Sequence, residues 1–320
     1  MAVVWLSPNP KLGWADTDVQ LRLYIIEGAI TIFIGFLVML ILPDFPDTWR
    51  AFSPEMKRVA NRRLAIDAAE ADVDDAGGMS QITGMKLAFQ DPKTYMLALA
   101  YMGITGAAGF QNFFPTLTKT LGYNQVISLL LVAPPYVFMV FWSFGHCYAS
   151  DYLGNRFWFL TYPVFISSVG FIIFMTTDSF GPRYFSFFLM NFVFAQNGTI
   201  YAWISNAIPR PPAKRAAALA FINSVGNSAS IWTPFTYWPS SAPHYRPALG
   251  ICIGLEVVAL GCFVGMRLYL QYQNRQLARM ENLDQELTER DLRKLQKTAE
   301  IEGVDVETVR AMQKGYRYML

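Results

Sequence analysis

The segment 196–238 constrains the fold of this chain more than any other part of the sequence. It contains two long apolar stretches that are joined by a short loop rich in proline. That loop carries three basic residues, Arg210, Lys214 and Arg215. Lys and Arg accumulate in the loops of membrane proteins that stay in the cytoplasm. We therefore expect a hairpin of two membrane-crossing helices with a cytoplasmic turn.

Further apolar stretches of similar length run along the rest of the chain. Seven are expected, at about residues 23–42, 95–117, 126–147, 157–175, 184–207, 216–238 and 247–270. Each has about the 20 residues that an α-helix needs to cross a bilayer. The chain is 53% hydrophobic and only 16% charged, against roughly 25% charged residues in an average soluble domain. The sequence therefore predicts an all-α polytopic membrane protein.

The basic residues of the loops predict how these spans are oriented. Lys and Arg cluster after the first, fifth and seventh spans, and Arg156 follows the third, whereas the loops on the other side hold single basic residues such as Lys119. By the positive-inside rule the C-terminus lies in the cytoplasm and the N-terminus outside. A plasma-membrane location is the expected one.

Local signals outside and within the spans predict where helices start and pack. Ser53-Pro54-Glu55 and Asp91-Pro92 are typical helix starts, because Ser and Asp cap free backbone N–H groups and proline fits the first turn. Pro134-Pro135 is expected to break the third span. Gly103, Gly106 and Gly109 give the second span a surface on which another helix can pack closely.

The residue inventory excludes several classes of function. The sequence has no HExxH, G-x-S-x-G or phosphate-loop motif, and it holds two histidines and three cysteines without metal-ligand spacing. We therefore expect no enzyme activity, no metal site, no cofactor and no nucleic-acid partner. The cysteines are interpreted as small core residues.

Five segments resemble a known family. They are IIEG at 25–28, LPDFPDTWRAFSPEMKR at 42–58, DAAEADVDD at 67–75, FFPTLTKTLGY at 113–123 and SNAIPRPPAKRAAALAFINSVGN at 205–227. Together, and in this order, they resemble the fungal allantoate permease branch of the anion:cation symporters, in the major facilitator superfamily. Members of that branch have twelve helices in two halves and import organic anions such as nicotinate or pantothenate together with protons.

The resemblance implies a division of the chain. Residues 1–22 form an atypical N-terminal segment, 23–42 resemble helix six, 43–93 a central cytoplasmic loop, 94–270 a six-helix C-terminal half, and 271–320 a cytoplasmic helical tail. The expected fold is a major facilitator half-bundle of six helices plus one preceding helix. Five helices are expected to be missing, through a truncated gene model, a partial duplicate or an alternative start.

The resemblance also implies a cytoplasmic gate. The loop SDYLGNR at 150–156 can be compared with the superfamily signature G-x-x-x-D-(R/K)-x-G-x-R, in which Asp and Arg hold helix ends together. Asp151, Gly154 and Arg156 match it, whereas Cys147 replaces the first glycine and Tyr152 the first basic residue. The departures predict a weaker gate, and an ordinary turn remains the alternative.

Amides inside the spans are the candidate solute-binding groups. Six are proposed: Gln111, Asn112, Gln196, Asn197, Asn223 and Asn227. A carboxamide offers both donors and acceptors, so it can orient a carboxylate without burying a net charge. The alternative is that these amides bond neighbouring helices.

One acidic residue, three aromatic residues and one histidine complete the candidate functional residues. Glu256 lies midway along the seventh span, where an ionisable group is costly, so proton coupling is one interpretation and a protonated structural role the other. Trp142, Tyr201 and Trp203 could pack on a flat solute, although packing within the protein is the commoner use. His146 is expected at the cytoplasmic border.

The sequence leaves three functions open. The first is half of a proton-coupled organic-anion transporter, inactive alone, whose partners are the lipid bilayer, the anion, protons and a chain that supplies the missing N-terminal helices. The second is a seven-helix receptor, which fits the span count and orientation. The third is a membrane scaffold that does not transport.

Overall fold

The computed structural model describes residues 14–41, 49, 52–67, 80–119, 127, 130–209 and 211–282, with short pieces of the tail that include 317–320. Every secondary-structure element in these residues is helical, as the sequence predicts. The chain divides into two compact units, Met1–Asp75 and Ala76–Leu320, whose boundary falls inside the expected polar segment 43–93. Each unit is described by itself.

The first unit holds α1 (Trp14–Ile41) and α2 (Pro54–Asp67). The apolar part of α1, Tyr24–Leu40, corresponds to the first expected span. The expected start of α2 is confirmed, because the Ser53 hydroxyl accepts a hydrogen bond from the backbone N–H of Met56 at 3.3 Å. That cap satisfies a donor that the first turn of a helix leaves free.

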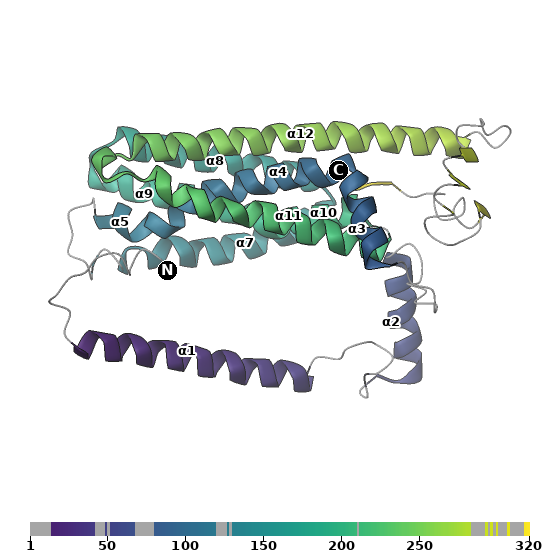
Figure 1. The fold of residues 1–320 in the computed structure, drawn as a ribbon, viewed down its shortest axis with the longest axis horizontal. Helices are drawn as coiled ribbons and strands as arrows, with labels where there is room; N and C mark the ends of the chain where they lie inside the picture. The colour runs from purple at the N-terminus through teal and green to yellow at the C-terminus, as the bar shows by residue number, and fades with distance from the viewer. Residues whose placement is uncertain are drawn as a thin grey trace. The chain divides into compact units, whose positions relative to one another are not determined.

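The second unit is a bundle whose long helices share one direction, while the short α3 runs across it (Figure 1). Its α-helices are α3 (Gln81–Gln90), α4 (Pro92–Ala107), α5 (Phe114–Lys119), α7 (Ala133–Leu153), α8 (Arg156–Thr176), α9 (Phe180–Met190), α10 (Gln196–Ala207), α11 (Pro212–Trp232) and α12 (Arg246–Asn282). Four 3₁₀ segments lie between them: η2 (Ala108–Phe113), η3 (Asn191–Ala195), η4 (Thr233–Thr236) and η5 (Pro239–Ser241).

Helix α4 is at the centre of the packing, against α11 on one side and α12 on the other. The expected role of the glycines of the second span is confirmed. A Cβ at Gly103 of α4 would meet the main-chain oxygen of Leu255 on α12 at 2.6 Å, and a Cβ at Gly109 of η2 would meet Thr233 of η4 at 2.9 Å. Helix α8 packs against α9, α10 and α12, and buries phenylalanines such as Phe171 and Phe174 completely.

Two of the expected spans are interrupted near the middle. The second is α4, then η2, then α5, and the fifth is α9, then η3, then α10. A 3₁₀ segment is narrower than an α-helix and has a different hydrogen-bond pattern, so each interruption changes which side chains face the core. The glycines of the second span are a sequence signal for the first interruption, whereas the sequence predicts no interruption of the fifth span.

The expected third span is interrupted just before the proline pair. Residues 127 and 130 are helical, residues 131–132 form a turn, and Pro134 and Pro135 stand in the first turn of α7, which begins at Ala133. Proline fits this position because the first N–H groups of a helix lack intrahelical partners anyway. The helix then runs without a break to Leu153.

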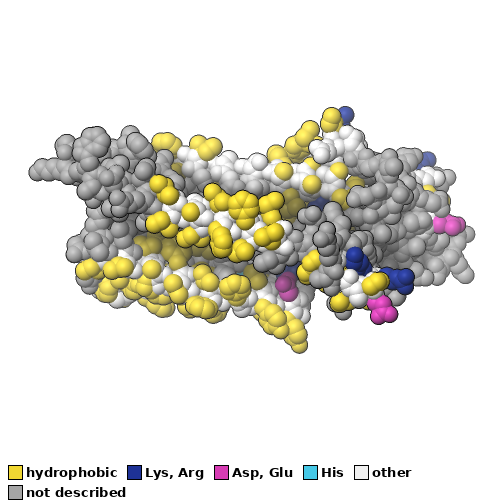
Figure 2. Space-filling model, turned by 90° about the horizontal axis from the view of Figure 1, so that it is seen from below, with side chains coloured by type: hydrophobic (Ala, Val, Ile, Leu, Met, Phe, Trp, Pro, Cys, Tyr) yellow, Lys and Arg dark blue, Asp and Glu magenta, His cyan; other side chains and the backbone are white. Residues whose placement is uncertain are grey.

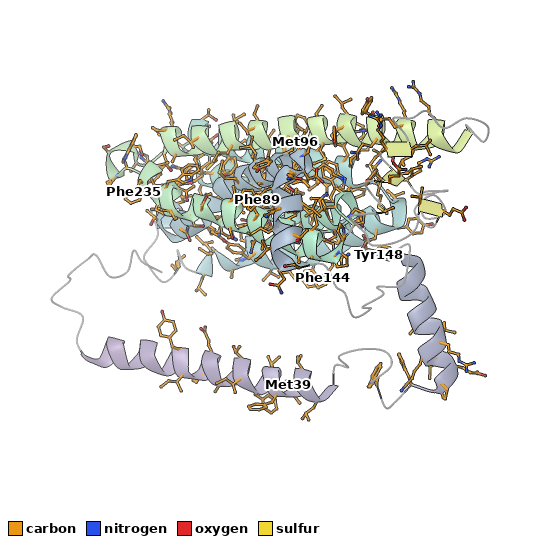
Figure 3. The ribbon with its side chains drawn as sticks, turned by 45° about the vertical axis from the view of Figure 1, so that its right-hand side comes forward. Met39, Phe89, Met96, Phe144, Tyr148 and Phe235 are labelled. Carbon is orange, nitrogen blue, oxygen red and sulfur yellow. The ribbon has the colours of Figure 1, made fainter. Side chains whose placement is uncertain are left out.

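The outside of the second unit is apolar. On α7, Phe141, Phe144 and Tyr148 are each more than 70% exposed, and Figure 3 shows Phe144 and Tyr148 on the outer side of the bundle. Figure 2 shows one face of the whole chain, both units included, and on it most coloured side chains are hydrophobic and few are charged. Soluble proteins rarely expose continuous apolar surface of this kind, which is typical of contact with lipid or another membrane helix.

Two helices of the described part, Arg156–Thr176 and the Arg246–Arg279 section of α12, are long and apolar enough to cross a membrane by length and composition. The other expected spans fall short for visible reasons. The second and fifth are divided by 3₁₀ segments, and α11 carries Lys214, Arg215 and two asparagines. The number of crossings therefore stays a prediction.

Candidate functional site

A polar wall lies on α11 and the helices beside it. We use this name for Tyr101 of α4, Tyr201 of α10, and Asn223 and Asn227 of α11. The Tyr201 hydroxyl is 2.9 Å from Asn223 Oδ1 and 2.8 Å from the Tyr101 hydroxyl. Asn227 Nδ2 donates to Asn223 Oδ1 at 2.6 Å. Both asparagines are exposed, so their remaining hydrogen-bonding capacity faces outward from an otherwise apolar bundle.

Local geometry explains why these side chains meet. Asn223 and Asn227 are four residues apart on α11, which places them one turn apart on one face. The helix approaches α4 closely at Gly226, where an added Cβ would collide with the Tyr101 ring. Thr105 on α4 donates to the Gly226 carbonyl at 2.6 Å across the same contact. The close approach therefore brings Tyr101 within reach of Tyr201.

The two expected amide pairs lie in different environments. Gln111 and Asn112 are exposed on η2, whereas Gln196 is buried at the start of α10 and Asn197 is half-buried. No hydrogen bond joins either pair to Asn223 or Asn227 among the residues the structure describes. Among the six proposed amides, the hydrogen bonds of the described residues thus join only Asn223 and Asn227 to each other.

Glu256 lies inside the bundle, between α12 and α8. Its side chain is buried, and its two carboxyl oxygens contact the hydroxyls of Ser167 and Ser168, the latter at 2.6 Å. Ser167 Oγ is also 2.8 Å from the carbonyl of Pro163. A hydroxyl has a single proton. If Ser167 donates to that carbonyl, Glu256 must be the donor to Ser167, which fits a neutral carboxylic acid.

The expected gate residues form an ion pair. Arg156 Nη1 lies 2.5 Å from Asp151 Oδ1 and 3.0 Å from Ser150 Oγ. Between them the chain turns at Gly154, whose φ of 60° ends α7 in the left-handed region that favours glycine. Asp151 is largely exposed and Arg156 is nearly buried. The turn therefore connects the end of α7 to the start of α8 through a charged contact.

The other aromatic candidates and His146 take structural positions. Trp203 is fully buried, so it does not face a solute, and Trp142 donates to the Tyr162 hydroxyl at 3.3 Å. His146 is not exposed at the border but buried, with Nδ1 2.6 Å from the Tyr162 hydroxyl and Nε2 3.0 Å from Thr199 Oγ1. This network connects α7 with α8 and α10.

A buried charge cluster lies where α4 and α11 begin. Asp91 caps α4 by accepting from the Lys93 N–H at 3.0 Å, and its other oxygen is 2.6 Å from Lys214 Nζ. Lys93 Nζ donates to the Ala207 carbonyl at 2.7 Å. Burial lowers the pKa of Lys93 to about 8, while Asp91 opposes the change and Lys214 adds to it. Lys214 was expected only to orient its loop.

Metal chemistry has no support in the described residues. They contain no group of three His, Cys, Asp or Glu side chains placed to hold a metal ion. The three cysteines are free, and Cys252 is buried, as expected of a small core residue.

Comparison with known proteins agrees with this architecture. The sequence profile of the Major Facilitator Superfamily matches residues 21–234, more than half of the chain. The chain belongs to the Major Facilitator Superfamily. It is therefore an integral membrane protein of a transporter family. No solved structure matches the sequence significantly.

Fungal members of the superfamily are similar along most of the chain. An uncharacterized transporter of Schizosaccharomyces pombe, C1683.12, is 29% identical over 272 residues, 84% of this chain and 53% of its own length. The MFS-type transporter efuF of Hormonema carpetanum is 26% identical and is covered to 53%. The high-affinity nicotinic acid transporter of Saccharomyces cerevisiae is 23% identical over 74% of this chain and 44% of its own length. The chain thus spans about half the length of these relatives.

Asn191 is a buried polar residue that the sequence did not single out as a candidate. It lies in η3, is fully buried, and neither atom of its amide has a hydrogen-bond partner in the described residues. Gln196 Oε1, a few residues further on, is also without one. An asparagine in the middle of an apolar span was a visible signal. It lies five residues before the amide pair 196–197 in the same apolar span.

Proposed function

We propose that this chain forms the six-helix C-terminal half of a proton-coupled importer for a small organic anion. The observation that carries the proposal is the polar wall, because it exposes Asn223 and Asn227 on an otherwise apolar bundle. Exposed amides in a membrane helix are costly unless they line a cavity or bind a polar partner. Major facilitator transporters bind their solute between two halves.

The class of solute follows from the chemistry of the wall. Two carboxamides and two phenol hydroxyls supply neutral donors and acceptors, which can orient a carboxylate, and Tyr201 adds a ring edge. Similarity to a relative named as a nicotinic acid transporter supports a vitamin-like carboxylate. Within the superfamily we propose the fungal allantoate permease branch, on the five sequence segments that resemble it.

Proton coupling is assigned to Glu256. It is the one acidic side chain well inside a described helix of the second unit, and it is buried against the hydroxyls of Ser167 and Ser168. An ionisable group at this depth is typical of proton carriage. We place the protein in the plasma membrane with its C-terminus in the cytoplasm, by the basic residues of its loops. We propose that the protein has no enzyme activity and uses no cofactor.

Membership of a transporter family disfavours a seven-helix receptor. A scaffold without transport activity remains an outcome of the test. The amides Gln111, Asn112, Gln196 and Asn197 are proposed as contributors to solute binding in the assembled transporter, where the partner half would face η2 and the start of α10.

The test is an uptake assay in a yeast host that lacks its own carboxylate permeases. The chain is expressed alone and together with the N-terminal half of a full-length relative, and uptake of labelled nicotinate and pantothenate is measured at pH 5 and pH 7. We expect saturable uptake, faster at pH 5, only when both halves are expressed together, because alternating access requires two bundles around a shared site.

The matched variants are on α11. Asn223→Ala together with Asn227→Ala should reduce uptake by the pair at least tenfold, about the effect of losing one or two hydrogen bonds to a charged solute. Ser224→Ala changes an exposed polar residue next to Asn223 and should leave uptake near normal. Equal uptake by both variants, or no uptake by a correctly inserted pair, would count against the proposed function.

A further inference from the structure

The residues Tyr318–Leu320 lie against the bundle although α12 ends far before them in sequence. Figure 1 marks this end of the chain beside the ends of α3 and α4. Tyr318 makes a reciprocal pair of hydrogen bonds with Asn274 of α12. Its N–H donates to Asn274 Oδ1 at 2.8 Å, and its carbonyl accepts from Asn274 Nδ2 at 2.9 Å. One amide side chain thus binds both main-chain groups of Tyr318.

The next two residues contact α10 and α8. The Met319 carbonyl accepts from Trp203 Nε1 at 3.2 Å. The Leu320 oxygen accepts from the backbone N–H of Arg156 at 2.7 Å and lies 3.5 Å from that of Phe157. The first N–H groups of a helix have no intrahelical partners. Leu320 therefore satisfies the start of α8 beside Asn155, whose side chain accepts from the N–H of Trp158.

Side chains extend this contact to a fourth helix. Lys93 Nζ of α4 lies 4.8 Å from the centre of the Tyr318 ring, within the range of a cation–π interaction. Tyr318 and Leu320 also pack on the hydrophobic core of the bundle. Three consecutive residues thus contact α4, α8, α10 and α12, chiefly through main-chain groups that particular side chains recognise.

The contact meets the candidate gate at Arg156. The guanidinium of this residue pairs with Asp151, and its main-chain N–H binds Leu320. Met319 is partly exposed, so the segment lies at the edge of the bundle. We propose that Tyr318–Leu320 form a releasable clasp that binds the cytoplasmic ends of these four helices and positions Arg156 for its ion pair with Asp151. The role in gating rests on the proposed function.

Hydrogen–deuterium exchange of the purified full chain in detergent tests the clasp directly. Asn274→Asp removes the donor to the Tyr318 carbonyl and places a negative charge beside that oxygen. A second variant ends the chain after Arg317 and so removes the clasp. The control is Arg275→Gln, which changes an exposed residue next to Asn274 on the same helix.

We expect the N–H groups of Arg156 and Phe157 to exchange at least about tenfold faster in the first two variants, because Leu320, their acceptor, is released in one and removed in the other. Exchange should be unchanged in Arg275→Gln and around Ser167 in the middle of α8. Wild-type rates at Arg156 and Phe157 in the chain that ends after Arg317 would overturn the proposal. A photoreactive phenylalanine at position 318 should cross-link to α12 or α4, and cross-links elsewhere would also overturn it.

Uptake separates the clasp from the proposed function. In the co-expressed pair, removing Tyr318–Leu320 should slow uptake about as much as Asp151→Asn does, with normal abundance. Faster exchange with unchanged uptake would overturn the positioning role of the clasp. If the wild-type pair does not transport, the proposed function fails, and the exchange rates still decide whether the clasp exists.

Discussion

Asp91 Oδ2 lies 2.6 Å from Lys214 Nζ, and this ion pair connects the start of α4 with the first turn of α11. The two side chains are only 10% and 19% exposed. A second cation, Lys93, is 3.8 Å from the same oxygen. A single carboxylate therefore compensates two ammonium groups at the corner where α4 and α11 begin.

Asp91→Asn should destabilise the bundle through charge alone. Asparagine also caps helices, so the bond from the Lys93 N–H is retained, while two buried cations lose their counter-charge. We expect a loss of about 3 kcal/mol in the free energy of unfolding, typical of breaking a buried pair. Denaturation of the purified protein in detergent measures this loss.

The control is Asp151→Asn, which breaks an ion pair whose carboxylate is exposed and should cost less than about 1 kcal/mol. Equal losses would contradict the prediction.

Lys93 should make stability depend on pH in the alkaline range. Burial lowers its pKa in the folded protein to about 8, from an ordinary value of 10.5. Between these values the unfolded chain holds a proton that the folded chain has released, so stability rises with pH. The gain approaches about 3 kcal/mol across the window, at about 1.4 kcal/mol per pH unit.

Melting curves between pH 7.5 and 10 test this dependence. Wild type should gain stability relative to Lys93→Met as the pH rises, and Lys86→Met, which changes an exposed lysine of α3, should follow the wild-type trend. A difference between wild type and Lys93→Met that stays constant over this range would show that Lys93 does not titrate there.

Asp151→Asn should slow transport without unfolding the protein. It breaks the ion pair with Arg156 that joins the end of α7 to the start of α8. In the co-expressed pair we expect uptake to fall about fivefold to tenfold, a coupling of 1–1.4 kcal/mol, with normal abundance in the membrane. Asp178→Asn removes another exposed carboxylate, 3.2 Å from His244, and should transport normally. Normal uptake by Asp151→Asn would remove the gate from the mechanism.

Glu256→Gln should separate proton coupling from folding. The amide keeps the size of the neutral acid and can still bond Ser167 and Ser168, so the free energy of unfolding should change by less than about 1.5 kcal/mol. Uptake by the pair should lose its dependence on external pH. Glu256→Ala also leaves a cavity and removes the carboxyl partner of Ser168, and should lose about 2 kcal/mol or more. A Gln variant that still transports faster at pH 5 would assign Glu256 a structural role.

Local signals in the sequence predicted helix starts and close packing well. Ser53 and Asp91 cap helices as expected, and Gly103 lies against α12. These features depend on a few neighbouring residues, which is why a single sequence can reveal them. The superfamily was also predicted, through segments spread over most of the chain, whereas its branch and solute stay proposals.

Features that depend on distant residues could not be predicted. The segment Asn191–Ala195 has no proline or glycine, yet packing against α7 and α8 accompanies a 3₁₀ segment there. Asp91 and Lys214 are far apart in sequence. Trp203 faces inward and Tyr201 faces the polar wall, although both are aromatic residues on one short helix. Which face of a helix is buried depends on its neighbours, and hydrophobicity on all sides conceals it.

The glycine contacts of α4 have a consequence for how such a site can evolve. Gly103 meets the main chain of α12 and Gly226 meets the ring of Tyr101, so backbone and ring already fill the space that a methyl group would need. The spacing of α4, α11 and α12 is therefore constrained, since alanine at either glycine would require the main chain of α12 or the Tyr101 ring to move. On the proposed function, a new solute preference would therefore arise by exchanging single side chains on a fixed frame, such as the exposed Asn223 and Asn227.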